Sequence, residues 1–304
     1  MLGPALDALL YRLLARRRAR AASSWPVTMR CVDTVHGRLR VADSGGEQPV
    51  LLIAPDGPCV IEHYAPLVAL LQARLRVVVV DLPGFGHSAP SARYTHRLAH
   101  GAQVLIDVLD ALQIERAALA LSCVNGCYAI AAARTAPDRI SQLFLAQTPG
   151  LPGLQDWTQR MVPAPIRVPV LGQALNFLTR RKVAHGWYSV ALAHREDRAP
   201  FRQIADTSLQ QGGCYCFAGV VQGMSATRGE DPLLRALDVP ATLVWGAADR
   251  SHRHTDPETL RAHLPQLRIV RYEDCGHFPE LEAPQRYAAL VLNTLFPATP
   301  SPPA

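Results

Sequence analysis

The stretch ALALSCVNGCYAI (residues 118–130) joins a short apolar run, a polar turn and the start of a helical pattern. The run before Ser122 is continuously apolar, which is typical of a strand buried on both faces of a sheet. A sharp turn must follow, because the helical pattern begins within a few residues. Strand–turn–helix units of this kind present a nucleophile at the turn in many enzymes, and here the turn is L-S-C-V-N-G, with Cys123 near its centre.

Further apolar runs with the length of buried strands recur along the chain. Together with 117–121, they cover residues 49–54, 76–81, 141–147, 240–246 and 267–273. Helical patterns lie between them, for example at 97–112 and 126–136. This alternation predicts an α/β protein with a doubly wound, mostly parallel sheet. In such sheets, ligands bind at the carboxyl ends of the strands, so we expect the site there.

One long segment breaks the alternation. Residues 149–237 lack a strong strand and contain proline-rich turns and helical pieces, which predicts a helical lid over the site. We expect its aromatic side chains to line a substrate pocket, unless they only form the core of the lid itself. These pocket candidates are Trp157, Trp187, Tyr188 and Phe217. The predicted core then comprises residues 25–148 and 238–296.

The two ends of the chain differ from the rest. Residues 1–24 begin with MLGPALDALLYRLLARRRAR, which predicts a basic amphipathic helix that is too short to span a bilayer. Its positive charge follows the apolar stretch, the wrong order for a secretory signal. We favour a helix that packs on the domain or a frayed terminus over a helix that makes weak contact with a membrane surface. Residues 297–304 are proline-rich and predicted to be disordered.

Composition limits the classes of partner. Of the 304 residues, 49% are hydrophobic and only 6% aromatic, and the formal net charge is +6. With so few aromatic side chains for base stacking, we expect a small-molecule substrate and no nucleic acid. The seven cysteines are scattered, with no C-x-x-C pair and no zinc-type spacing with histidine. This pattern favours reduced thiols in a cytoplasmic protein and indicates neither a metal nor an organic cofactor.

Three polar motifs follow predicted strands. DLPGFGHS (81–88) marks a tight turn, VWGAAD places Asp249 just beyond a later strand, and EDCGHFPELEAP (273–284) places His277 on the next loop. A nucleophile, then an acid, then a histidine is the chain order of the triad in one large group of hydrolytic enzymes. In such a triad the histidine takes the proton of the nucleophile and the carboxylate fixes the histidine tautomer.

From about residue 30 to residue 296 the chain resembles the α/β-hydrolase superfamily. The resemblance rests on the motifs above together with LDALQIERAALALSC (109–123) and RTAPDRISQLFL (134–145). It implies an α/β-hydrolase fold with a helical lid, Asp249 as the triad acid and His277 as the triad base. It also implies an oxyanion hole built from the backbone N–H of Val124 and from the loop at Asp56 and Gly57.

The nucleophile position of the turn can be assigned to either of two residues. Counting seven residues on from Arg116 and fourteen back from Pro137, as is common in the family, places the nucleophile at Cys123 without a gap. Requiring small residues two places on either side instead centres the turn on Val124, between Ser122 and Gly126. Valine cannot attack a substrate, and a β-branched residue is strained at positive φ, so we favour Cys123. Ser122 should then point elsewhere.

The predicted oxyanion hole departs from the family pattern. The loop APDGPCVIEHY (54–64) has no H-G pair, although Gly57 permits a tight turn. A carboxylate at Asp56 would oppose a developing oxyanion if it pointed inward. We therefore expect Asp56 to cap the loop outward and to donate, if at all, through its backbone. The alternative is a substrate-facing carboxylate.

The leading hypothesis is an ester or thioester hydrolase, or an acyltransferase, that forms a thioester on Cys123 and acts on an apolar or aromatic acyl group. A second hypothesis keeps the fold but uses the His277–Asp249 pair as a base in cofactor-free lyase or oxygenase chemistry. A third is a non-catalytic binding protein for small molecules, motivated by Leu121 and Asn125 where small residues are expected. Reactivity of the Cys123 thiol would separate the first hypothesis from the third.

Overall fold

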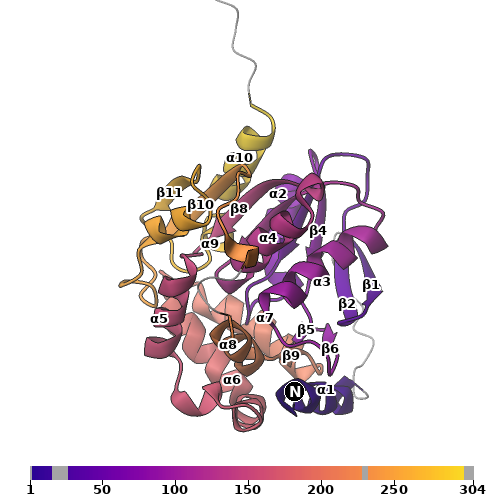
Figure 1. The fold of residues 1–304 in the computed structure, drawn as a ribbon, viewed down its shortest axis with the longest axis vertical. Coiled ribbons are helices and arrows are strands. Elements are labelled where there is room, and N and C mark those ends of the chain that lie inside the picture. Colours follow the sequence, from indigo (N-terminus) through magenta and orange to yellow (C-terminus); the bar gives the residue numbers. More distant parts are fainter. Residues whose placement is uncertain (1, 16–26, 228–231, 298–304) are drawn as a thin grey trace, which may run out of the picture.

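The computed structural model describes residues 2–15, 27–227 and 232–297, and a twisted sheet lies at its centre (Figure 1). In spatial order the main strands are β1 (Thr28–Thr34), β2 (Gly37–Asp43), β4 (Arg76–Val80), β3 (Val50–Ala54), β7 (Ala117–Ser122), β8 (Ile140–Ala146), β10 (Ala241–Gly246) and β11 (Arg268–Tyr272). Within this sheet the pairings from β4 to β11 are all parallel, whereas β2 pairs antiparallel with β1, with β4 and with the short β6 (Ala89–Pro90). The predicted mostly parallel α/β sheet is confirmed.

Strand β3 shows why these runs are apolar throughout. Leu52 and Ala54 face one hydrophobic core, whereas Leu51 and Ile53 face a second core on the other side of the sheet. Side chains alternate along a strand, so a strand covered on both faces must be apolar at every position. Continuously apolar runs therefore identify such strands in the sequence. Strand β1 is largely exposed and lacks such a run, so the sequence analysis did not predict it.

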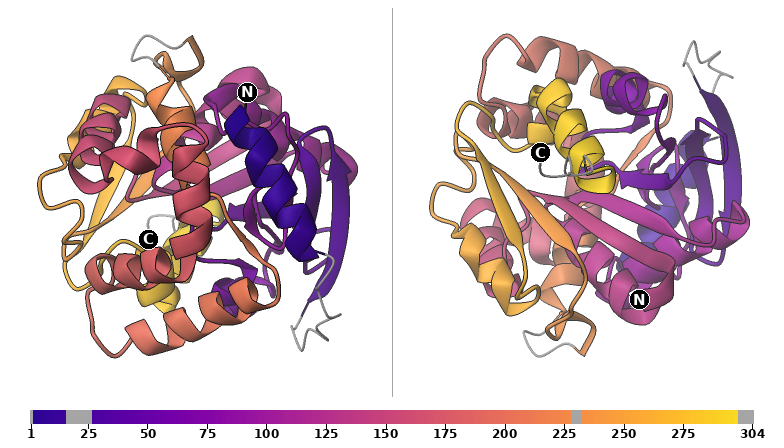
Figure 2. Two further views of the ribbon diagram at one scale, coloured as in Figure 1. Left: turned by 90° about the horizontal axis from the view of Figure 1, so that it is seen from below. Right: turned by 90° about the horizontal axis from the view of Figure 1, so that it is seen from above.

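Helices cover both faces of the sheet (Figure 2). The first core packs α3 (Leu98–Ala111) and α4 (Val124–Thr135) against the strands. The second core contains residues of α2 (Ala65–Leu71) and α10 (Pro284–Leu295), with the short α9 (Pro279–Glu282) before α10. Short 3-10 helices lie at 61–64, 137–139, 164–167, 232–234 and 257–262.

A helical segment between β8 and β10 lies at the carboxyl ends of the strands (Figure 1). It contains α5 (Leu151–Met161), α6 (Leu171–Ala191), α7 (Arg198–Gln210) and α8 (Phe217–Ser225). The short strand β9 (Cys214–Tyr215) pairs with β5 (Phe85–Gly86), in the loop after β4. This pairing joins the helical segment to the core beside the predicted site.

The N-terminal helix α1 (Leu2–Ala15) packs on this helical segment, close to α6 and α8. Tyr11 is fully buried and its hydroxyl accepts a hydrogen bond from the backbone N–H of Tyr215 at 3.0 Å. Leu2, Leu9 and Leu13 remain exposed. Residues 16–24 of the predicted helix and 298–304 of the predicted tail lie outside the described residues. Within the described chain, no helix combines the length and apolar character needed to cross a bilayer.

Candidate active site

The turn between β7 and α4 is centred on Cys123. This residue has φ 51° and ψ −127°, and Val124 is already the first residue of the helix. Non-glycine residues rarely adopt positive φ, and such strain often marks functional sites. The backbone N–H of Cys123 donates to the carbonyl of Ala146 at 2.8 Å, which ties the turn to β8. The geometry thus centres the turn on Cys123 rather than on Val124.

The residues around the turn explain how it closes without small neighbours on both sides. Leu121 belongs to the first hydrophobic core and is buried there. Asn125 donates from Nδ2 to the carbonyl of Pro55 at 3.0 Å, so its side chain joins α4 to the loop that carries Asp56. Gly126 must stay small, because a Cβ atom there would lie 2.2 Å from Oγ1 of Thr148.

His277 and Asp249 lie at the ends of neighbouring parallel strands. His277, on the loop after β11, is fully buried, and its Nδ1 is 2.7 Å from Oδ2 of Asp249 on the loop after β10. The Cys123 thiol interacts with the His277 ring, and its Sγ lies within 4.8 Å of a ring nitrogen. The structure therefore brings Cys123, His277 and Asp249 together in one chain of contacts.

Two residues that the sequence analysis did not single out hold the Asp249 carboxylate. Gln147 donates from Nε2 to Oδ2 at 3.0 Å, and its Oε1 accepts from the backbone N–H of Gly246 at 2.7 Å. Ser251 donates to Oδ1 from both its hydroxyl and its backbone N–H. No motif in the sequence marks Gln147, because its role depends on the contact between two adjacent strand ends.

Asp56 differs from the outward orientation expected from the sequence. Its carboxylate points into the site, with Oδ2 3.3 Å from Nε2 of His277, and the residue is only 7% exposed. The reason is that the buried His277 ring offers a hydrogen-bonding partner inside the site. His277 thus lies between two carboxylates, with Asp249 on one ring nitrogen and Asp56 on the other.

Burial and these carboxylates determine the charges of the site. Burial lowers the pKa of His277, but Asp249 and Asp56 outweigh it and raise that pKa well above its usual range. Burial raises the pKa of Asp249, whereas the adjacent His277 brings it down to about 2. Burial and Asp56 raise the pKa of the Cys123 thiol, although His277 and the Val124 backbone N–H oppose them. The thiol is therefore the favoured resting form of Cys123.

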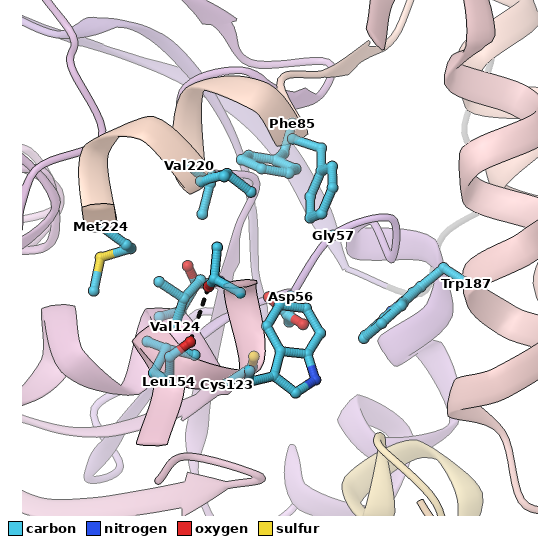
Figure 3. Close-up of a pocket in the computed structure, with 14 residues that line it drawn as sticks. Asp56, Gly57, Phe85, Cys123, Val124, Leu154, Trp187, Val220 and Met224 are labelled. Carbon is cyan, nitrogen blue, oxygen red and sulfur yellow. Dashed lines mark hydrogen bonds between the residues drawn. The ribbon is translucent and has the colours of Figure 1, made fainter. Parts of the chain in front are cut away.

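A mostly apolar cavity opens beside Cys123 (Figure 3). The Cys123 sulfur and the Asp56 carboxylate face the same space, and Phe85, Val220 and Met224 lie across it. The cavity volume is about 40 Å³, enough to hold at least one water molecule. The lining residues are Asp56, Gly57, Phe85, Cys123, Val124, Asn125, Leu154, Trp157, Thr158, Trp187, Phe217, Val220, Val221 and Met224. Residues of the core and of α5, α6 and α8 therefore share one enclosed space.

Most of the predicted pocket residues lie in this space. Trp157, Trp187 and Phe217 line it, together with Gly57 and Val124 from the predicted oxyanion hole. Tyr188 does not line it: its hydroxyl contacts Sγ of Cys59 and Nε2 of His63 in the second hydrophobic core. Trp187 and Tyr188 are consecutive on α6, and consecutive helical residues point in different directions. Ser122 points away as expected, donating to Oε1 of Glu280 at 2.6 Å.

Comparison with known proteins identifies the family. The model of the alpha/beta hydrolase family matches residues 34–290, and the chain belongs to this family. Haloalkane dehalogenase 2 of Mycobacterium tuberculosis is 26% identical over 286 residues, covering 88% of this chain and 95% of the relative. A 2-hydroxy-6-oxononadienedioate/2-hydroxy-6-oxononatrienedioate hydrolase of Paraburkholderia phymatum is also 26% identical, over 284 residues, with 88% and 96% covered.

A solved structure agrees on the fold. Carboxylesterase CesB of Bacillus subtilis superposes with a TM-score of 0.67 at 19% identity, covering 98% of this chain and 100% of that one. At this identity the likeness concerns the fold alone, and it agrees with the α/β-hydrolase fold predicted from the sequence. The family and the fold are thereby established, whereas the bond that the protein cleaves is a separate question, because one fold hosts many reactions.

Proposed function

We propose that this member of the alpha/beta hydrolase family hydrolyses esters or thioesters through a covalent thioester on Cys123. The observation that carries the proposal is the position of Cys123 at the strained turn, beside a His277 ring that is held by Asp249. A nucleophile, a base and a group that orients the base are the parts that covalent catalysis needs. Family membership supports hydrolysis in general, and the thiol at the turn supports this particular mechanism.

The first half-reaction forms the acyl-enzyme. This step needs the neutral His277 ring, and because the pKa of His277 is raised, that form is favoured at higher pH. The neutral ring removes the proton of Cys123, and the thiolate attacks the substrate carbonyl carbon to form a carbon–sulfur bond. The backbone N–H groups of Val124 and Gly57 are the candidate donors for the oxyanion. Position 57 has no room for a side chain, because a Cβ atom there would lie 2.3 Å from the Phe85 ring. The bond to the leaving alkoxide or thiolate then breaks, and His277 returns its proton to that group.

The second half-reaction releases the acid. His277 removes a proton from water, the hydroxide attacks the thioester carbon, and the bond to Sγ breaks. The proton on His277 then returns to the Cys123 thiolate, which restores the resting state. An alcohol, amine or thiol in place of water would give acyl transfer by the same steps.

The cavity supports a small, neutral acyl group. Its walls are mostly aromatic and aliphatic, with Asp56, Cys123, Asn125 and Thr158 as the exceptions, and about 40 Å³ admits only a short chain while the helical segment keeps this position. The indole N–H groups of Trp157 and Trp187 are buried without a hydrogen-bonding partner among the described residues. These two groups could donate to a polar atom of a bound substrate.

The test is acylation and turnover with short acyl esters and aryl thioesters. Native protein should hydrolyse them, and rapid quenching followed by peptide mass spectrometry should find the acyl group on Cys123. Cys123→Ala should lower kcat/KM at least a thousand-fold. Cys127→Ala removes a second buried thiol one helical turn further along α4, outside the cavity lining, and is the matched control. Full activity in Cys123→Ala, or an acyl group on another residue, would refute the proposal.

One observation favours a second candidate. The Asp56 carboxylate lies in the cavity beside the base His277, and carboxylates can themselves act as nucleophiles. Attack of Asp56 on a saturated carbon would displace a halide or open an epoxide, giving an enzyme-bound ester that water cleaves with His277 as base. Haloalkanes and epoxides should then alkylate Asp56, and Asp56→Asn should abolish turnover while Cys123→Ala retains it. This is the reverse of the pattern expected for the thioester mechanism.

A further inference from the structure

His252 is a buried polar residue that the proposed mechanism does not use. It lies three residues after Asp249 and is 2% exposed. Neither ring nitrogen has a hydrogen-bonding partner among the described residues. Its ring is stacked between Trp157, at 5.3 Å and 7°, and His277, at 5.2 Å and 29°. Buried polar atoms are nearly always paired, so two orphaned nitrogens on one ring indicate a missing partner.

The missing partner can be located from the neighbours of His252. One ligand atom from each of Cys123, His252 and His277 lies within 4.8 Å of the other two. In a tetrahedral zinc site, metal–sulfur bonds of about 2.3 Å and metal–nitrogen bonds of about 2.0–2.1 Å place the ligand atoms roughly 3.5 Å apart. The three separations in this structure, each within 4.8 Å, therefore exceed that value by at most about 1.3 Å.

The surroundings of His277 also suit a metal ion. Metal-binding histidines usually direct their other ring nitrogen to a carboxylate, and Nδ1 of His277 already contacts Asp249 at 2.7 Å. The other ring nitrogen, Nε2, lies 3.3 Å from the Asp56 carboxylate, which adds negative charge beside the three ligand atoms.

We propose that Cys123, His252 and His277 bind a zinc ion. A thiolate with two imidazoles matches zinc, whereas magnesium and calcium prefer oxygen ligands. Three protein ligands leave a fourth position for water or another ligand. Sγ of Cys123 cannot be a zinc ligand and a free nucleophile at once, so bound zinc blocks thioester formation. The site requires no hydrolytic activity and therefore stands apart from the proposed function.

The test is metal binding to untagged, full-length, metal-free protein. Zinc is titrated by calorimetry and cobalt(II) by absorption, because a tetrahedral cobalt–thiolate centre gives a sulfur-to-metal charge-transfer band and visible ligand-field bands. We expect one equivalent of each metal. His252→Phe, which keeps the ring stacking but has no nitrogen, should weaken binding at least a hundred-fold. Cys123→Ser should remove the charge-transfer band.

Matched controls come from the same elements. Cys127→Ala removes another thiol of α4, and His254→Phe removes an exposed histidine from the same loop as His252. Both should bind zinc as the native protein does, and circular dichroism checks that each variant is folded. The absence of a charge-transfer band in native protein, or unchanged binding in folded His252→Phe, would overturn the zinc site. Failure of the ester and thioester assays in metal-free protein would refute only the proposed function.

Discussion

The charge of one side chain, Asp56, affects both the nucleophile of the candidate site and the substrates that fit it. A carboxylate within 3.3 Å of the base His277 disfavours both a thiolate at Cys123 and an oxyanion beside it. The same charge repels an anionic group on the substrate. The charge of Asp56 therefore predicts a preference among substrates.

We predict that native protein discriminates against acyl groups that carry a carboxylate. A neutral butanoyl thioester should have a higher kcat/KM than the succinyl thioester of the same length. Asp56→Asn keeps the size of the side chain and removes its charge, so it should raise kcat/KM for the succinyl substrate about ten-fold more than for the butanoyl one. Steady-state kinetics of native protein and Asp56→Asn, each with the butanoyl and the succinyl thioester, gives the four values of kcat/KM to compare. Equal changes for both substrates would mean that the Asp56 charge does not face the acyl group.

At the scale of single elements, the start of α6 is a point of strain. Val170 precedes the helix with φ 71° and ψ −56°, and its side chain is 41% exposed. This conformation is close to a γ-turn that is rare for residues with a side chain, and a β-branched residue suits it poorly. Its backbone N–H donates to Oε1 of Gln173 at 2.8 Å, a bond that does not need the valine side chain.

We predict that Val170→Gly stabilises the protein. Glycine adopts positive φ freely, and relief of the strain should exceed the extra entropy of the unfolded chain, leaving a gain of about 0.5–1 kcal/mol. Val168→Gly is the control, because Val168 is also half-exposed but has an ordinary φ of −87°. Chemical denaturation should show opposite signs for the two variants. Destabilisation by both would contradict the assignment of strain to Val170.

At the scale of the whole molecule, α1 is attached to the helical segment through a buried acid. Asp7 is 2% exposed, and burial raises its pKa from 3.8 to about 7, against hydrogen bonds with Cys216 and Gln173 that lower it. The protonated form is therefore favoured in the folded protein. This stabilisation is complete below about pH 4 and is lost as the pH rises through about 7. The full difference is on the order of 4 kcal/mol.

We predict that Asp7→Asn removes this pH dependence. Native protein should lose thermal stability between pH 5 and pH 8, whereas the variant, which is neutral at every pH, should be more stable than the native protein by several degrees at pH 8.5. Thermal unfolding at a series of pH values measures the effect. Asp33→Asn, at an exposed position on β1, is the control and should follow the native profile. Parallel profiles for Asp7→Asn and native protein would refute the prediction.

The placement of α1 bears on the predicted membrane contact. Tyr11 and Asp7 pack inward, as the packing alternative requires, while Leu2, Leu9 and Leu13 face outward. Contact with a membrane surface through these leucines stays a prediction, as does the cytoplasmic location. A weaker attachment of α1 at high pH would free further apolar side chains of the same helix for such a contact.

The sequence by itself determined the parts of this protein that depend on local patterns. Strands covered on both faces must be apolar throughout, so β3, β4, β7, β8, β10 and β11 were all predicted. The positions of Cys123, Asp249 and His277 followed from motifs at strand ends. The exposed strand β1 and its antiparallel partner β2 were not predicted, because a solvated antiparallel edge of a sheet does not require continuously apolar residues.

Only the tertiary structure decided which side chains meet. The inward turn of Asp56, the support of Asp249 by Gln147 and the separation of Tyr188 from the cavity all depend on contacts between distant segments. The cluster of Cys123, His252 and His277 has no sequence signature either, because its members come from three loops and lack the spacing of a zinc motif. A parallel sheet aligns the carboxyl ends of strands that lie far apart in the chain, so its site chemistry is assembled in space rather than along the sequence.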